Sequence, residues 1–590
     1  MKPHFLTICL ALAAAQMASS GTVLAAADSS RPHLETRHGA RQLIVDGQPF
    51  LILSGELHNS SSSSREYMKP IWPQLAQRNL NTVLAVITWE LIEPQEGRFD
   101  FTSVDDCLQG ARQNHLRLVI LWFGSWKNGE SSYQPYWVKA NPQRFPWAKD
   151  RAGKTLNILS TFGDATRDAD ARAYGALMRH IRQVDGKEHT VLMMQVENEV
   201  GVLGDSRDHI AAANEAFARP VPKDLMSHLA QHKATLSPEL REVWAANGFK
   251  TSGAWEEVFG PGRPDSVPPV PAEERDTAWH RLYWPVDEFF MAWRYSMYVN
   301  KVAAAGKAEY DIPMYVNTWL QEPSHPRPGE FPSGCPEPEV HDIWRFGAPS
   351  IDILAPDLYV RTFAETCERF IRNGNPLFIP ETGANASNAL IAFLKYNTIG
   401  FSPFGIEGRG GAPGMGAPSP DPLAQTYAIL DYLAPVILDN QGKGTIAMLQ
   451  PMDNTNAPPQ TLKLGDYTLN IGYGAGVVGG GGGQGGRGGR GGGRGGGGGR
   501  SDFTNASPAR FVINSGPGEY VFVGGPMNVT FTPNTPERGS VVMGSFDETL
   551  YVDGHWVAGR RLNGDETGNN TRWPGIGSFG IYRYALFQRQ

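Results

Sequence analysis

Two glutamates in this 590-residue chain have the setting that acid–base chemistry requires. Glu199 comes just after the apolar run 191–196, and Glu381 closes the shorter apolar run 376–381. Each run has the length of a buried strand, so each glutamate is expected at the C-terminal end of a strand. Hydrolysis of a glycosidic bond needs two such carboxyl groups, because one protonates the leaving oxygen while the other attacks or activates water. The pair therefore predicts glycosidase chemistry.

The two glutamates would have different roles. If folding holds their carboxyl groups about 5 Å apart, the reaction is expected to retain the anomeric configuration through a covalent intermediate. Glu381, ionised, would be the nucleophile. Glu199, its pKa raised partly by the neighbouring carboxylate, would be the general acid and then the base. Asn198 could donate its amide to the sugar 2-hydroxyl, and Glu197 is expected to be structural support. Weaker alternatives to the pair are Glu56, Glu90 and Glu93.

Other residues at the ends of strand-like runs are candidate sugar contacts. An aromatic ring can stack on the apolar face of a pyranose, although core packing is the alternative for each ring. The candidates are His58, Trp89, Trp126, Lys127, Asn128, Asn317, Trp319 and Tyr359. Tyr359 could also hydrogen-bond Glu381 and orient it. No group of His, Asp and Glu has metal-ligand spacing, so neither a metal nor a cofactor is predicted.

Eight strand-like runs would bring these residues together. They are residues 50–55, 82–87, 116–123, 191–196, 312–319, 351–359, 376–381 and 398–404. Helical patterns separate nearly all of them, which predicts an α/β fold, a closed (β/α)₈ TIM barrel with its site at the C-terminal ends of the strands. The alternative is an open doubly wound sheet, but no glycine-rich phosphate loop follows the first run.

The pattern divides the chain into two domains. The barrel is expected over residues 34–435, with an insertion after the fourth strand, about 202–310, that walls one side of the site. Beyond residue 440, short alternating runs predict an antiparallel β-sandwich or jelly roll over 440–590. Within it, the Gly/Arg-rich segment 474–500 is expected to be a disordered loop, because it cannot bury apolar surface.

The N-terminal residues and the composition indicate an exported globular protein. Residues 1–27 combine Lys2, an apolar segment and a small-residue cleavage site, which predicts a secretory signal and a periplasmic or extracellular location. A formal charge of -7 predicts no nucleic-acid partner, and no other stretch is apolar enough to span a membrane. Cys107, Cys335 and Cys367 allow at most one disulfide, and buried thiols are expected. The oligomeric state stays open, with a dimer as one alternative.

Several motifs resemble those of one enzyme family. The stretch 195–201, Gln-Val-Glu-Asn-Glu-Val-Gly, resembles the acid/base motif of glycoside hydrolase family 35, the β-galactosidases of a large (β/α)₈ clan. Stretches 54–58 and 89–101 are similar to the family's first-strand and second-strand signatures. The resemblance implies that Glu199 is the acid/base and Glu381 the nucleophile. The sequence departs from the family's pattern at residues 124–128. At this point the family usually has a Glu-Trp pair that contacts the sugar.

The resemblance implies a retaining exo-β-galactosidase whose substrate is a carbohydrate. The branch that the chain resembles most, bacterial and with one small C-terminal β domain, includes enzymes that trim galactose from xyloglucan side chains. Three alternatives stay open. One is a glycosidase of the same clan that acts on another sugar or cuts inside a polymer. The second is a carbohydrate-binding protein without catalysis, and the third is an RNA-binding protein that uses the Arg-Gly repeats.

Overall fold

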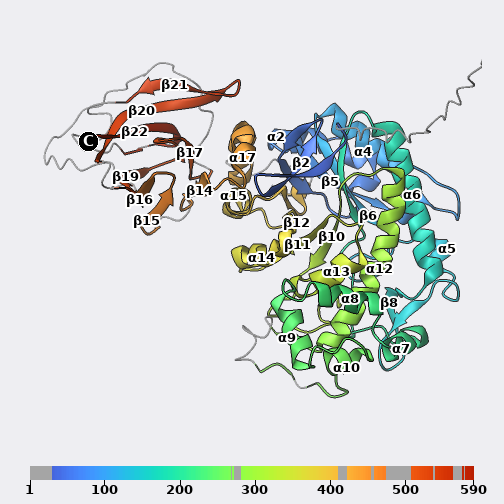
Figure 1. The fold of residues 1–590 in the computed structure, drawn as a ribbon. Helices are drawn as coiled ribbons and strands as arrows, with labels where there is room; N and C mark the ends of the chain where they lie inside the picture. The colour runs from blue at the N-terminus through green and yellow to red at the C-terminus, as the bar shows by residue number, and fades with distance from the viewer. Residues whose placement is uncertain are drawn as a thin grey trace, which may run out of the picture.

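A barrel domain and a smaller β domain follow one another along the chain (Figure 1). The computed structural model describes residues 30–267, 269–271, 281–408, 421–452, 457–473, 507–535, 539–562, 575–576 and 578–589. The predicted signal segment 1–27 and the Gly/Arg-rich loop 474–500 lie outside these described residues.

Eight parallel strands close into a barrel, which confirms the predicted fold class. They are β4 (Ile52–Glu56), β5 (Thr82–Thr88), β6 (Arg117–Phe123), β9 (Val191–Val196), β10 (Met314–Trp319), β11 (Ile353–Leu358), β12 (Ile379–Thr382) and β13 (Gly400–Pro403). Every residue of β5 and β9 is buried. Helices cover the outside of the barrel and side chains fill the inside, so the strands are continuously apolar rather than alternating.

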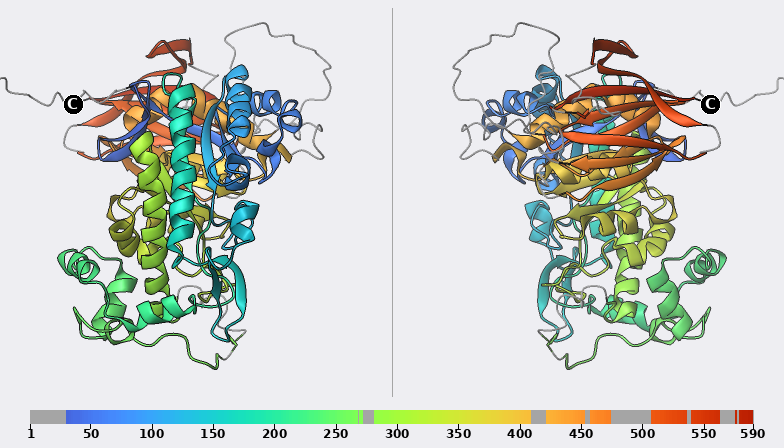
Figure 2. Two further views of the ribbon diagram at one scale, coloured as in Figure 1. Left: turned by 90° about the vertical axis from the view of Figure 1, so that its right-hand side faces the viewer. Right: turned by 90° about the vertical axis from the view of Figure 1, so that its left-hand side faces the viewer.

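Helices surround the barrel in the order that a (β/α)₈ fold requires. They are α1 (Arg65–Met68), α2 (Trp72–Gln77), α4 (Thr102–Gln113), α6 (Asp164–Asp185), α12 (Pro285–Glu309), α13 (His341–Gly347), α14 (Phe363–Phe370), α15 (Ala386–Lys395) and α16 (Pro422–Tyr432). The two long helices α6 and α12 run side by side along the barrel (Figure 2). Before the barrel, β1 (His33–Arg37), β2 (Ala40–Val45) and β3 (Gln48–Phe50) form a small antiparallel sheet with the predicted turn at Asp46 and Gly47.

The insertion after β9 is shorter than the sequence range 202–310 suggested. In the part of the insertion that the structure describes, the short helices are α7 (Ala211–Ala218), α8 (Lys223–Gln231), α9 (Pro238–Ala246) and α10 (Trp255–Phe259). These helices gather at one end of the molecule (Figure 1). Helix α12, by contrast, packs on α6 and connects β9 to β10, so it is a helix of the barrel itself.

The C-terminal domain is an antiparallel sandwich of two sheets, as predicted. The larger sheet has the order β14 (Ile446–Met448), β17 (Phe511–Gly516), β18 (Glu519–Gly524), β22 (Gly580–Arg589), β20 (Ser540–Val552) and β21 (His555–Arg561). The smaller sheet has the order β15 (Gln460–Leu464), β16 (Tyr467–Tyr473) and β19 (Met527–Pro533). Leu469, Phe522 and Phe531 belong to the apolar layer between them. Residues such as Phe511 and Val523 belong instead to the core cluster of the barrel and its helices.

The cysteines and the apolar character of the helices were also predicted from the sequence. Cys107, Cys335 and Cys367 are buried and unpaired, as predicted. None of the helices in the described ranges is both long enough and apolar enough to cross a bilayer.

Candidate active site

Three carboxyl groups meet where strands β9, β11 and β12 end. Glu199 lies three residues beyond β9, where Glu197 and Glu199 both have positive φ, 63° and 45°. Glu381 is the penultimate residue of β12, and Asp357 on β11 is its partner in the parallel register. Parallel strands deliver their C-terminal side chains to one edge of a barrel, which is why segments far apart in the sequence converge here.

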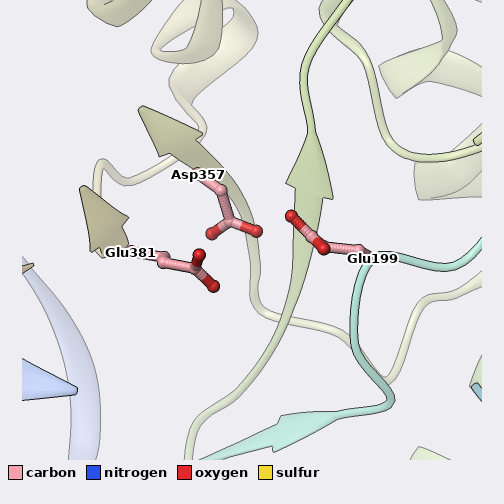
Figure 3. A group of neighbouring side chains, drawn as sticks. All are labelled: Glu199, Asp357 and Glu381. Carbon is pink, nitrogen blue, oxygen red and sulfur yellow. The ribbon is translucent and has the colours of Figure 1, made fainter. Parts of the chain in front are cut away.

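The carboxyl groups are close enough to interact directly. One oxygen from each of Glu199, Asp357 and Glu381 lies within 4.8 Å of the others. Asp357 lies between the two glutamates, with one oxygen toward each (Figure 3). Glu199 and Glu381 are 6% and 8% exposed. At an effective dielectric constant near 20, two negative charges 4.8 Å apart repel by about 3.5 kcal/mol, so three ionised carboxylates are strongly disfavoured.

Burial and mutual repulsion raise the pKa of most of these groups. Burial raises the pKa of Glu199 to about 7; the Lys127 ammonium opposes this rise, and the Glu381 carboxylate adds to it. Burial, and next the charges of Glu381 and Glu199, raise the pKa of Asp357 well above its usual range. Burial and Glu381 do the same to the pKa of Glu56, at the end of β4. A pKa near neutrality suits a group that must first donate and then accept a proton.

One cation balances this acidic centre. Lys127, just after β6, is buried near Glu199, Glu381, Glu56 and Asp357. Burial alone would lower its pKa, but these four carboxyl groups together raise it, so the ammonium form is retained. With Lys127 charged, the centre is neutral when one of the four carboxyl groups is ionised and three carry protons.

Tyr359 orients Glu381, as the sequence predicted. The Tyr359 hydroxyl, on a side chain that is 55% exposed overall, donates a hydrogen bond of 2.8 Å to Glu381 Oε1. Glu381 Oε2 is buried and has no hydrogen-bond partner among the described residues. One oxygen is therefore fixed and the other is free to react.

Asn317, on β10, connects Glu199 to Asp357. Its Oδ1 accepts the backbone N–H of Glu199 at 3.0 Å, and its Nδ2 donates to Asp357 Oδ2 at 2.6 Å. Asn317 was predicted to bind the sugar, and in this structure each of its amide atoms makes one hydrogen bond within the protein. We therefore assign it a positioning role.

Other predicted contacts lie at the same end of the barrel. Asn198 is fully buried, and both of its amide atoms lack a hydrogen-bond partner among the described residues. Trp319 is half-buried at the end of β10. His58 is exposed after β4, with Nδ1 3.1 Å from Glu407 Oε1. Asn128 is exposed on the loop after β6 and has a φ of 54°.

Two of the predicted aromatic contacts are wrong. Trp126 is fully buried, its Nε1 donates to the Leu159 carbonyl at 3.0 Å, and its ring centre lies 4.5 Å from that of Tyr298. Trp89 is also fully buried and donates to Glu93 Oε2 at 2.9 Å. Both indoles pack in the protein core, so neither ring is available to stack on a sugar.

Glu197 supports the site, as expected. Its Oε2 accepts the backbone N–H of Trp126 at 2.9 Å, which holds the loop after β6. Burial, and next the contact with Asp170 on α6, raise the pKa of Glu197 well above its usual range. Asp170 in turn accepts the Ser125 hydroxyl at 2.6 Å. These hydrogen bonds therefore fix the loop that carries Lys127.

Of the three alternative acids, only Glu56 belongs to the centre. Glu90 makes an ion pair with Lys139 at 3.4 Å, and Glu93 accepts from Arg172 at 2.8 Å. Sequence reasoning missed Asp357 altogether. The available signal was the one that identified Glu381: an acid at the end of an apolar strand-like run.

The cluster could also supply oxygen ligands for a hard divalent cation. Glu199, Asp357 and Glu381 are the carboxylates that Ca²⁺ would take. However, the neighbouring Lys127 ammonium repels a second cation, and protons on the raised-pKa carboxyl groups compete with it. The chemistry of this centre therefore favours proton transfer over metal binding.

Comparisons with known proteins agree with this chemistry. Residues 42–288 match the family model Glycosyl hydrolases family 35, and residues 423–573 match a domain of unknown function, DUF5597. A β-galactosidase of Xanthomonas manihotis is 29% identical over 217 residues, 36% of this chain and 32% of that protein. Beta-galactosidase-1-like protein 3 of Homo sapiens is 24% identical over 217 residues, 36% of this chain and 31% of that protein. The match thus spans about a third of each relative.

Solved structures of low sequence identity are also similar to this chain. The crystal structure of a β-galactosidase from Bacillus circulans sp. alkalophilus has 15% identity and a TM-score of 0.43, over 66% of this chain and 57% of that one.

Proposed function

The chain carries a glycosyl hydrolases family 35 domain over residues 42–288, and from this premise we propose that it is a retaining exo-β-galactosidase. It would release terminal, non-reducing β-D-galactose from oligosaccharides. The observation that carries the proposal is the meeting of Glu199 and Glu381, whose carboxyl oxygens lie within 4.8 Å of one another. Retaining glycosidases hold their two carboxyl groups about 5–5.5 Å apart, close enough for direct attack on the sugar.

In the first step, the free Oε2 of Glu381 attacks the anomeric carbon while the Tyr359 hydroxyl holds Oε1. The bond between the anomeric carbon and the leaving oxygen breaks, and Glu199 gives its proton to that oxygen. The products of this step are the free leaving group, a galactosyl ester of Glu381 and an ionised Glu199.

In the second step, Glu199 acts as the base. Its carboxylate takes a proton from water, the resulting oxygen attacks the anomeric carbon, and the ester bond to Glu381 breaks. The single negative charge thus moves from Glu381 to Glu199 and back again. Because Lys127 interacts with both carboxyl groups, it can balance the charge in either state without moving.

Several residues would hold the sugar. The unpartnered amide of Asn198 is suited to the 2-hydroxyl, a contact that strengthens in the transition state. Trp319, half-buried at the end of β10, can stack on the pyranose. The branch that the chain resembles points to galactosylated xyloglucan oligosaccharides as substrates. The pattern of residues 1–27 supports export to the periplasm or the cell exterior.

A panel of 4-nitrophenyl glycosides tests the proposal. We expect hydrolysis of the β-D-galactoside in clear preference to β-D-glucoside, β-D-xyloside and α-L-arabinoside, with β-galactose as the first anomer seen by NMR. Glu381→Gln should lose activity by at least about a thousandfold, because the amide is a poor nucleophile. Preference for another sugar, release of α-galactose first, or an active Glu381→Gln would each refute the corresponding part of the proposal.

The same panel separates the alternatives. An enzyme that cuts inside a polymer would release oligosaccharides, rather than galactose, from a polysaccharide assayed beside the panel. A carbohydrate-binding protein would bind galactosides without hydrolysing any of them. A carbohydrate-binding protein without catalysis would need one of the two carboxyl groups to point away from the other. In this structure, Glu199 and Glu381 face one another (Figure 3).

A further inference from the structure

Asp357 is a third carboxyl group at the reacting centre and has no role in the two-step reaction. It lies outside the matched segment 42–288, on β11, and is 3% exposed. It is placed between the acid/base and the nucleophile, in contact with Glu199 and opposite Glu381 in the strand register.

The hydrogen bonds of Asp357 indicate which of its oxygens are acceptors. Oδ2 accepts from Asn317 Nδ2 at 2.6 Å, and the same asparagine accepts the backbone N–H of Glu199. Oδ1 is buried, and no donor reaches it among the described residues. The bare Oδ1 leaves room for a proton on Asp357 that can be donated to a neighbouring carboxyl group, and the surrounding charges decide whether that proton is present.

The surrounding charges support the same conclusion. The ionisable groups that face Asp357 from the neighbouring elements are Glu56, Lys127, Glu199, Tyr315, Tyr359 and Glu381. Among the residues that the structure describes, Lys127 is the one cation of this group, and its positive charge is matched by the single carboxylate that the reaction requires. A second carboxylate at Asp357 would be buried without a counter-ion.

We propose that Asp357 is a positioning residue that keeps its own proton and donates it in a hydrogen bond to the carboxyl group of Glu199. The Asp357 hydroxyl then holds the acid/base in place on one side, while Asn317 holds its backbone on the other. The part that concerns catalysis rests on the proposed function; the protonation state of Asp357 does not.

The proton stays on Asp357 throughout the reaction. When Glu199 gives its proton to the leaving oxygen, the new carboxylate is the acceptor of the Asp357 hydroxyl. When Glu199 takes a proton from water, that hydrogen bond weakens and the neutral pair is restored. No proton moves from Asp357 to the substrate, so its function is to stabilise the ionised form of Glu199 between the two steps.

Titration of Glu199 in the substrate-free protein tests the proposal without any need for turnover. The carboxyl carbon of Glu199 can be followed by NMR in protein labelled with carbon-13 at glutamate Cδ, with Glu199→Gln to assign the signal. Asp357→Asn keeps a donor and the same charge as a protonated aspartate, so we expect the titration midpoint of Glu199 to move by less than about half a pH unit. Asp357→Leu removes the donor, and the midpoint should rise by about one to two pH units.

Two results would overturn the proposal. If Asp357 is ionised, both substitutions remove a negative charge and both move the midpoint of Glu199 downward, Asp357→Asn by a unit or more. If Asp357 does not contact Glu199, neither substitution moves the midpoint. Asp352→Asn is the matched control, because Asp352 precedes the same strand and binds the Met314 N–H and Lys307 away from the site. It should leave the titration unchanged.

A catalytic readout separates positioning from a merely structural role. On a β-galactoside with a poor leaving group, the alkaline limb of kcat/KM should shift upward in Asp357→Leu and stay in place in Asp357→Asn. If the wild-type chain hydrolyses no β-galactoside, the proposed function fails while the titration still decides the state of Asp357. If the enzyme is active but the titration midpoint of Glu199 moves downward in the Asp357 variants, only the proposed role of Asp357 fails.

Discussion

Activity toward a galactoside with a poor leaving group should fall above neutral pH, because Glu199 must carry a proton to act as the acid. Burial, opposed by Lys127 and reinforced by Glu381, raises the pKa of Glu199 from 4.5 to about 7. This rise corresponds to about 3.4 kcal/mol between the two protonation states. Above a pKa of about 7, the protonated fraction falls about tenfold per pH unit, so kcat/KM should be about tenfold lower at pH 8 and about a hundredfold lower at pH 9.

Two substitutions assign this limb to Glu199. Glu199→Gln should remove the limb and should slow an alkyl β-galactoside far more than a 2,4-dinitrophenyl β-galactoside, because only the alkoxide needs a proton to leave. Lys127→Met removes the charge that opposes the rise in the pKa of Glu199, so the limb should move to higher pH. The assay is kcat/KM between pH 5 and 10 for the two substrates, with protein stability checked at each pH.

Three results would refute this reasoning. The first is a profile that stays flat up to pH 9 on the alkyl substrate. The second is an alkaline limb that persists in Glu199→Gln. The third is an equal loss on good and poor leaving groups, which would remove Glu199 as the acid.

Three further predictions follow from the same contacts. Tyr359→Phe removes the hydrogen bond to Glu381 Oε1, so kcat/KM should fall by about ten- to a hundredfold. The circular dichroism spectrum should show that the fold is kept. An unchanged kcat/KM would mean that the hydrogen bond does not orient the nucleophile. Trp126→Ala should lower the free energy of unfolding in urea by about 3–5 kcal/mol, because the Trp126 indole packs in the protein core. A change in KM without a change in stability would instead indicate that Trp126 contacts the sugar. Finally, the raised pKa of Glu199 makes a contribution to folding stability that is complete below about pH 4.5 and lost as the pH rises through about 7. The wild type should therefore lose up to about 3 kcal/mol relative to Glu199→Gln between pH 4.5 and 8, and parallel stability curves for the two proteins would contradict this.

The barrel could be predicted because its strands carry their own signal. The expected run 82–87 is β5 (Thr82–Thr88), and the expected run 191–196 is β9 (Val191–Val196). Strands buried on both faces are continuous apolar stretches with polar ends, which a sequence shows directly. The extent of the insertion could not be predicted, because helical periodicity over residues 285–309 does not say whether α12 packs on the barrel or on a loop.

The site could be predicted only at the level of the backbone. That Glu199 and Glu381 meet follows from the rule that strand ends converge, but the rule does not give the direction of each side chain. Trp126 stands next to Lys127 in the sequence, yet its indole turns into the core while Lys127 interacts with the carboxyl groups. Asp357 was missed because its importance depends on being opposite Glu381, a matter of strand register.

Trapping of the glycosyl-enzyme tests most directly whether Glu381 is the nucleophile of a retaining reaction. The 2-fluorine of 2,4-dinitrophenyl 2-deoxy-2-fluoro-β-D-galactoside slows both steps, and the activated leaving group restores only the first. After inactivation and proteolysis, mass spectrometry should find one fluorogalactosyl group, on the peptide that contains Glu381 and on no other. Inactivation with the label on a different residue, or steady turnover with no labelled peptide, would contradict the assignment of Glu381 as the nucleophile.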